Sequence, residues 1–337
     1  MNELHPSLIA LAPVRNESWI LDRYLRCASE WADHIVIADQ GSEDGSREIV
    51  RRFPKAVLVE NASATYDEGA RQRLLIDAAR RLVPEGKRIL IALDADEMLT
   101  ANWRESAEWR AMLEARPGTV LRFDWVNVLP GFEKCWIPPE PLPLGFVDDG
   151  SVHGGEAIHS TRIPVREGSP SLVLREIKVL HYQYTNWERM ESKQRWYQCW
   201  EHVKYPRKRA IPIFRQYRGM YARPPEQMHA FEAKWIDGYE GAGINMKDVR
   251  AEEMTWWDRE ILGMLRDHGA DFFRKQDIWN ADWPAIARQA GEVKAEGFAD
   301  PRSDFEKRVH QWLLDTQPRA LERRIRWIQR GLRLFGW

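Results

Sequence analysis

Two aspartates one residue apart close a buried apolar stretch of this sequence. The segment RILIALDADEMLT, residues 88–100, is apolar in its first half and then presents Asp94, Asp96 and Glu97. A D-x-D at the end of a strand places two hard oxygen ligands on the same side of the chain, at a spacing that suits Mg²⁺ or Mn²⁺ shared with substrate phosphates. The same pair can also cap a turn or a helix, so the motif alone leaves both interpretations open.

The elements around the motif predict an α/β fold with a mainly parallel sheet flanked by helices. We expect strands at 7–14, 34–39, 56–61 and 88–97, and helices at 18–32, 46–53 and 68–82. Strands that alternate with helices form βαβ units, and ligands bind beyond the carboxyl ends of such strands. The polar residues that follow the strands should therefore share one edge of the sheet.

The second half of the chain has a different pattern. Two further strands are expected at 119–129 and 171–184, separated by long loops, and helical periods dominate after residue 186. Of the 17 tryptophans, 11 lie in this last part, mostly as core or interface residues, with sugar-stacking walls as the alternative. We predict two domains, a catalytic domain at 1–185 and a helical region at 186–337 for acceptor, oligomer or membrane-surface contacts; the sequence predicts no oligomeric state.

Composition excludes several classes of protein. The 337 residues carry 50 Lys and Arg against 51 Asp and Glu. The chain therefore has no overall positive charge that would attract nucleic acid. Cys27, Cys135 and Cys199 are far apart and suggest neither a disulfide framework nor a zinc site. We see no secretion signal and no run of ~18 apolar residues that would span a membrane. A cytoplasmic location is expected.

Four motifs occur in the order found in one enzyme family. They are APVRNES (12–18), ADQGSEDGS (38–46), EGARQR (68–73) and LDADE (93–97). Together they resemble family 2 glycosyltransferases with the GT-A fold, over residues 7 to about 185, and most of all the soluble, metal-dependent members that build bacterial surface glycans, including lipopolysaccharide core. The resemblance implies an inverting transfer of a sugar from a nucleotide-sugar donor, by default UDP-linked, to a glycan or glycolipid acceptor, with Mn²⁺ or Mg²⁺ as cofactor.

The resemblance also implies roles for individual residues. The donor would be bound by Pro13, Val14, Arg15, Asn16, Glu17, Asp39, Gly41, Arg71, Asp94 and Ala95, with Asp39 on the base. The metal would be held by Asp96, Asp94 and His181, although a histidine beside a tyrosine is otherwise an ordinary hydrogen-bonded residue. Gln72 stands where the family usually has Asn, which puts that helix contact in doubt.

An inverting transfer also needs a base that deprotonates the acceptor hydroxyl. The candidates are Asp148, Asp149 and Glu156 in the loop after residue 146. The resemblance favours Asp149, because family members place an acidic residue downstream of the D-x-D. The alternative is that these acids only cap a turn.

Two other functions stay open. The segment ALDADEML also resembles the D-x-D strand of haloacid dehalogenase-like phosphatases, with Asp94 as nucleophile, but that family usually has the motif in its first strand and Thr or Val where Met98 stands. A non-catalytic glycan-binding protein on a transferase fold is the third interpretation, since fold does not fix function.

The C-terminal segment 319–337 is basic and amphipathic. Its apolar residues are expected on one helical face and its arginines on the other. Residues 318–337 contain six Arg and one Glu, a net charge of +5. Such a helix suits peripheral contact with an anionic membrane surface, or else it docks on its own protein with a solvated charged face.

Overall fold

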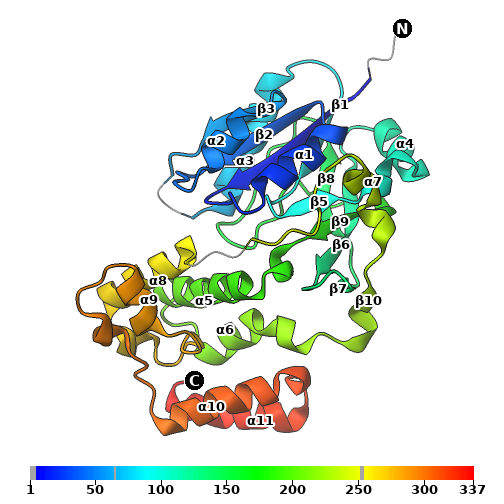
Figure 1. Cartoon of the computed structure of the whole chain (residues 1–337). Coiled ribbons are helices and arrows are strands. Elements are labelled where there is room, and N and C mark those ends of the chain that lie inside the picture. The colour runs from blue at the N-terminus through cyan, green and yellow to red at the C-terminus, as the bar shows by residue number, and fades with distance from the viewer. Residues whose placement is uncertain (1–4, 64–65, 251–253) are drawn as a thin grey trace. The chain divides into compact units, whose positions relative to one another are not determined.

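The computed structural model describes residues 5–63, 66–250 and 254–337. The chain forms two compact units (Figure 1), one made of residues up to 185 together with 229–250, and one made of 186–228 together with the rest of the chain. The first long segment of the first unit ends at residue 185. The segment 229–250 corrects the prediction, because its side chains Trp235, Ile236 and Tyr239 are buried in the core of the first unit.

The first unit is built on a mixed sheet whose centre is parallel. Its strands are β1 (Ser7–Val14), β2 (His34–Asp39), β3 (Ala56–Glu60), β4 (Arg88–Ala92), β5 (Glu97–Leu99), β6 (Val120–Val128), β7 (Lys134–Trp136), β8 (Leu142–Val147), β9 (Ser171–His181) and β10 (Met228–Ala230). The order is β10-β7-β6-β8-β4-β1-β2-β3, and β9 pairs with β5 and β6. Strands β4, β1, β2 and β3 run parallel, whereas β8 is antiparallel to β4. The predicted α/β fold class is confirmed.

Helices cover both faces of the parallel strands. They are α1 (Leu21–Trp31), α2 (Ser46–Arg51) and α3 (Glu68–Leu82), while α4 (Ala107–Glu114) packs against β9 and α7 (Asp237–Gly241) against the turn at 101–104. Successive side chains of β1 point to opposite faces, as in any strand. Ala10 packs in the cluster that contains α1, and Leu11 packs in the cluster that contains Leu75 of α3. Burial on both faces explains the continuous apolar runs and leaves polar side chains only at the strand ends.

The second unit is helical. Its helices are α5 (Trp187–Lys204), α6 (Ala210–Tyr217), α8 (Trp256–His268), α9 (Trp283–Gln289), α10 (Asp304–Asp315) and α11 (Arg323–Leu332). Trp196, Trp257, Trp283 and Trp337 are buried in this unit, as expected for core tryptophans. None of the helices in the described ranges has the length and apolarity needed to cross a bilayer.

Candidate nucleotide-sugar and metal site

The loops after β1 and β2 are bonded to each other at the carboxyl edge of the sheet. The backbone N–H of Asn16 donates to Ser42 Oγ at 2.9 Å, and the side chain of Asn16 accepts from the N–H of Glu43 at 2.8 Å. The N–H of Glu17 donates to Ser46 Oγ at 3.0 Å. Asn16 has φ of 55°, a left-handed conformation that Asn tolerates better than most residues. The predicted segment from Pro13 to Glu17 therefore forms a fixed rim beside Gly41.

Asp39 ends β2 within this rim. It pairs in register with Val14 on one side and with Glu60 on the other. Its Oδ2 accepts from the N–H of Ser42 at 3.2 Å and lies 3.6 Å from Arg47 Nε, whereas its buried Oδ1 has no hydrogen-bond partner. A buried acceptor that lacks a donor is costly, and the N–H of a nucleotide base would supply one.

The D-x-D segment lies at the same edge, because β4 pairs in parallel with β1. Leu11 is opposite Ala92, and Leu93 continues the ladder by donating to the carbonyl of Leu11 at 3.0 Å. Ala95 is buried between the two aspartates. Asp96 Oδ2 lies 3.6 Å from His181 Nε2, and the carbonyl of Asp96 accepts from the N–H of Tyr182 at 2.8 Å. The structure thus brings the D-x-D and His181 together.

The ring of His181 is oriented by two residues of β6. Its Nδ1 lies 2.7 Å from Asn127 Oδ1, and since an amide oxygen only accepts, Nδ1 carries the proton. The amide nitrogen of Asn127 faces the carbonyls of Trp125 and Trp136, which fixes which way the amide points. Trp125 stacks on the imidazole at 4.3 Å. Nε2, the nitrogen that a neutral ring with Nδ1 protonated would offer to a metal, faces Asp96.

A half-buried arginine lies beside these carboxylates. Arg162 donates to Asp94 Oδ2 at 2.9 Å and to Glu97 Oε1 at 3.0 Å. Burial alone would raise the pKa of Glu97, but the charge and hydrogen bonds of Arg162 outweigh it and hold this pKa below the ordinary value. Burial also acts to lower the pKa of Arg162, but Asp94, Glu97 and Asp96 outweigh it and raise this pKa. Asp94 and Glu97 therefore share one guanidinium in this cluster, and Asp96 lies close enough for its charge to raise the pKa of Arg162 as well.

Across the described residues, no group of three or more His, Cys, Asp or Glu side chains is arranged to hold a metal ion. Asp96 and His181 offer one oxygen and one nitrogen ligand, and Asp94 stands next to them with its Oδ2 bonded to Arg162. Divalent ions in phosphate-transfer sites often take only one or two protein ligands, with substrate phosphates and water completing the shell. The residues present fit such an ion.

The first turn of α3 faces the loop that contains Glu156. The N–H of Gly69 donates to the carbonyl of Glu156 at 2.9 Å, and the N–H of Glu68 donates to that of Ala157 at 3.0 Å. Because α3 follows β3, its first turn lies at the carboxyl edge of the sheet, so Arg71 and the exposed Glu156 are placed at this edge. Gln72 is buried, and its Oε1 has no hydrogen-bond partner.

Asp148 and Asp149 lie at the other end of β4, which corrects the favoured choice of base. Strand β8 runs antiparallel to β4 with Val147 opposite Ile89, so Asp148 comes level with Arg88 at the amino end of that strand. Asp148 is bonded to Arg80 at 2.8 Å and to Arg88 at 2.8 Å. The length of β4 separates both aspartates from the D-x-D, since a strand rises ~3.3 Å per residue.

Several residues of this edge escaped the sequence analysis. They are Trp125, Asn127 and Arg162, which orient His181 or pair with the D-x-D. An Asn between two Val residues near the end of a largely apolar strand was the available signal, because a buried amide needs partners. Arg162 follows a loop without a pattern, and nothing local indicates its partner.

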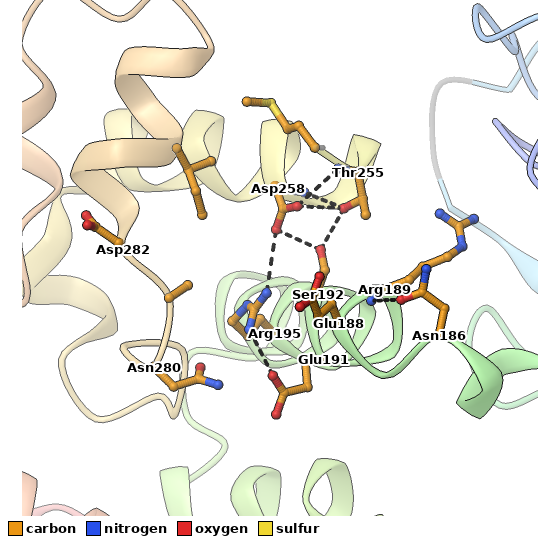
Figure 2. A pocket seen from close by; sticks show the side chains of 13 residues that line it. Asn186, Glu188, Arg189, Glu191, Ser192, Arg195, Thr255, Asp258, Asn280 and Asp282 are labelled. Carbon is orange, nitrogen blue, oxygen red and sulfur yellow. Dashed lines mark hydrogen bonds and ion pairs between the residues drawn. The ribbon is translucent and has the colours of Figure 1, made fainter. Parts of the chain in front are cut away.

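The second unit contains a cavity of about 260 Å³ lined by residues of α5, α8 and α9 (Figure 2). Thr255 and Asp258 form a capping box at the start of α8, and Ser192 of α5 donates to Asp258 at 2.7 Å. Arg195 lies 3.9 Å from Asp258 and from Glu191, beyond hydrogen-bond distance. Several of these polar side chains bond α5 to α8. None of the predicted donor or metal residues lines the cavity.

Comparison with known proteins leaves the family of the chain open. No family model matches it, and no curated protein matches it. Among solved structures, 4-diphosphocytidyl-2C-methyl-D-erythritol synthase superimposes with a TM-score of 0.28 at 16% identity, covering 42% of this chain and 72% of that one. HddC from Yersinia pseudotuberculosis superimposes with a TM-score of 0.28 at 10% identity, covering 52% of this chain and 93% of that one. Mannose-1-phosphate geranyltransferase from Thermus thermophilus superimposes with a TM-score of 0.27 at 15% identity, covering 44% of this chain and 51% of that one. Scores this low carry no argument about activity.

Proposed function

We propose that the first unit is an inverting, divalent-metal-dependent glycosyltransferase that moves a sugar from a nucleotide-sugar donor, by default UDP-linked, to a glycan or glycolipid acceptor of a surface polysaccharide. The observation that carries the proposal is the pair formed by Asp96 and His181, 3.6 Å apart, at the carboxyl edge of the sheet. The tautomer of His181 and the shared arginine at Asp94 support it. A phosphatase or a binding protein has no comparable observation in its favour.

Each residue of the edge has a separate task in this proposal. Asp39 Oδ1 accepts a hydrogen bond from the base, and the rim from Pro13 to Glu17 with Gly41 encloses the nucleoside. Asp96 and His181 hold Mn²⁺ or Mg²⁺, with Asp94 next to them and Arg71 toward the donor. When bound, the ion would stabilise the negative charge of the departing diphosphate. Arg162 holds Asp94 and Glu97 in position and keeps Glu97 ionised.

Glu156 is the base candidate that the geometry retains. It lies at the first turn of α3, on the same edge as the D-x-D, and its side chain is open to solvent and so to an acceptor. A positioned carboxylate that takes the proton of the acceptor hydroxyl typically accelerates the reaction ~10²–10⁴-fold. We assign this role to Glu156 in place of Asp149.

The direct test measures binding of UDP in the presence of Mn²⁺ by titration calorimetry, and then release of UDP from a panel of UDP-sugars. We expect Asp96→Ala to abolish both and Glu156→Gln to abolish release while binding persists. Asp149→Asn is the matched control and should leave both unchanged. The absence of binding for every nucleoside diphosphate with Mn²⁺ or Mg²⁺, or full binding by Asp96→Ala, would refute the proposal.

A further inference from the structure

The outer surface of the C-terminal helix combines arginines with exposed apolar side chains. The C-terminal basic surface is defined here as Arg323, Arg326, Trp327, Arg330, Arg333, Leu334 and Phe335. Trp327 is 75% exposed, Leu334 86% and Phe335 65%. Residues i, i+4 and i+7 of a helix share one side, so Arg323, Trp327 and Arg330 stand together, and the turn 333–335 extends the surface.

The inner side of the same helix is anchored in its own unit. Ile325 is 5% exposed, and Trp337 packs in a core cluster with Phe214 and Leu313. Lys275 Nζ donates to the carbonyl of Phe335 at 2.8 Å. The helix is therefore docked on its own protein, which was one of the two interpretations of the sequence. This docking holds the outer surface of the helix in a fixed orientation.

The anchoring also corrects the expected pattern of this segment. A single apolar face of Leu321, Ile325, Ile328, Leu332 and Phe335 was expected opposite the arginines. Instead Ile325 is buried, whereas Leu321 is 88% exposed and Phe335 65% exposed. Burial of the inner apolar residues in the protein leaves Trp327 among the arginines. Exposed Trp, Leu and Phe side chains gathered in one place indicate a binding surface more often than scattered ones do.

The charge of the segment is local and uncompensated. Its six arginines are Arg319, Arg323, Arg324, Arg326, Arg330 and Arg333. Within the described ranges, no ion pair joins any of them to a carboxylate, and the nearest acid in sequence is Glu322. The whole chain carries a net charge of −1, so the positive charge of this segment is a local feature.

We propose that the C-terminal basic surface binds an anionic lipid bilayer, with α11 parallel to the membrane plane. Helices that lie in the interface carry Arg or Lys together with Trp, Phe and Leu, so that the charges meet lipid phosphates while the rings enter the headgroup region. A nucleic acid would match the charge but would give Leu334 no apolar environment. The proposal uses the second unit alone and does not depend on the proposed transferase activity.

The experiment is co-sedimentation of the full chain with phosphatidylcholine vesicles, with and without phosphatidylglycerol. We expect binding only to the anionic vesicles and a loss of binding in high salt. Arg326→Gln with Arg330→Gln should lower the partition coefficient by about fivefold for each arginine removed. Trp327→Ala should weaken binding several-fold at unchanged charge.

The matched control is Arg259→Gln with Arg288→Gln, which removes the same charge from exposed positions on α8 and α9. It should bind anionic vesicles like the parent protein. All variants should keep the parent melting temperature, because the changed side chains are exposed. No binding to anionic vesicles, equal binding to neutral ones, or an equal loss in the control would overturn the proposal. So would self-association in solution that Trp327→Ala abolishes, because the surface would then belong to a second copy of the chain.

Discussion

Replacing Asp148 by Asn separates the structural role of this residue from the catalytic role that its motif suggests. The carboxylate of Asp148 is fully buried and bonded to Arg80 and Arg88, and it also accepts from the N–H of Gly150 at 3.0 Å. All of these contacts lie at the amino end of β4. We therefore expect the variant to lose stability and to keep nucleotide binding and turnover.

The magnitude follows from the burial of the partners. Removing one member of a buried ion pair typically costs ~3–5 kcal/mol, because the other charge is left without compensation. Arg80 and Arg88 keep 22% and 15% of their side-chain exposure and can recover part of their hydration. The amide oxygen of Asn keeps the bond to Gly150. We therefore take the lower end, about 3 kcal/mol, which lowers the melting temperature of a unit of this size by ~6–12 °C.

The effect should depend on pH in a defined direction. Burial alone would raise the pKa of Asp148, but the hydrogen bonds from Arg80, Gly150 and Arg88 hold it below its ordinary value. A carboxylate with a depressed pKa in the folded state stabilises the fold fully above its unfolded pKa of ~3.9. That stabilisation is lost as the pH falls through the folded pKa. The difference in melting temperature between parent and variant should therefore be largest at neutral pH and should disappear in strong acid.

The assay is thermal melting from neutral to acidic pH, together with UDP binding in Mn²⁺ at neutral pH. Asp149→Asn is the control, because Asp149 pairs with Arg166, whose side chain is 63% exposed. Surface pairs of this kind contribute ~0–1 kcal/mol. A variant at Asp148 that melts like the parent but loses binding would refute the placement of this residue and return it to the catalytic site.

Three further changes probe other parts of the chain. Asn127→Leu frees the ring of His181 and should weaken Mn²⁺-dependent UDP binding ~10–100-fold; unchanged binding would remove His181 from the metal site. Thr255→Ala breaks the capping box of α8 and should cost ~1 kcal/mol in denaturant unfolding; a cost below the error of that measurement would contradict it. Gly69→Ala places a Cβ 2.3 Å from the carbonyl oxygen of Gly155 and should destabilise by ~1–3 kcal/mol, whereas a melting temperature at or above that of the parent would show that this contact is not made.

Much of the first unit could be predicted because its signals are local. The expected strands at 7–14 and 34–39 coincide with β1 and β2, and the expected helix at 68–82 coincides with α3. Apolar runs and helical periods are properties of a few adjacent residues. Once the strands are known to be parallel, the convergence of Asp39 and the D-x-D at one edge follows from topology alone.

The errors came from features that depend on distant pairing. The position of Asp148 is decided by the antiparallel register of β8 on β4, and a strand's direction in a sheet leaves no mark in its own residues. The return of 229–250 to the first unit depends on apolar side chains such as Tyr239 finding a core built far away in the chain. The expected helical periods after residue 186 are met in this segment only by a short turn and α7 (Asp237–Gly241), and periodicity does not show which core such a segment covers.

The two ends of β4 show why acidic motifs must be interpreted with their partners. At the amino end, Asp148 is matched by two arginines, so its charge is fully compensated and it adds stability. At the carboxyl end, Asp94 and Glu97 share Arg162, and Asp96 faces Nε2 of His181. This second group combines oxygen and nitrogen ligands in one place, which is the chemistry that the proposed cation would need, whereas Asp148 has two arginines and, among the described residues, no such neighbour.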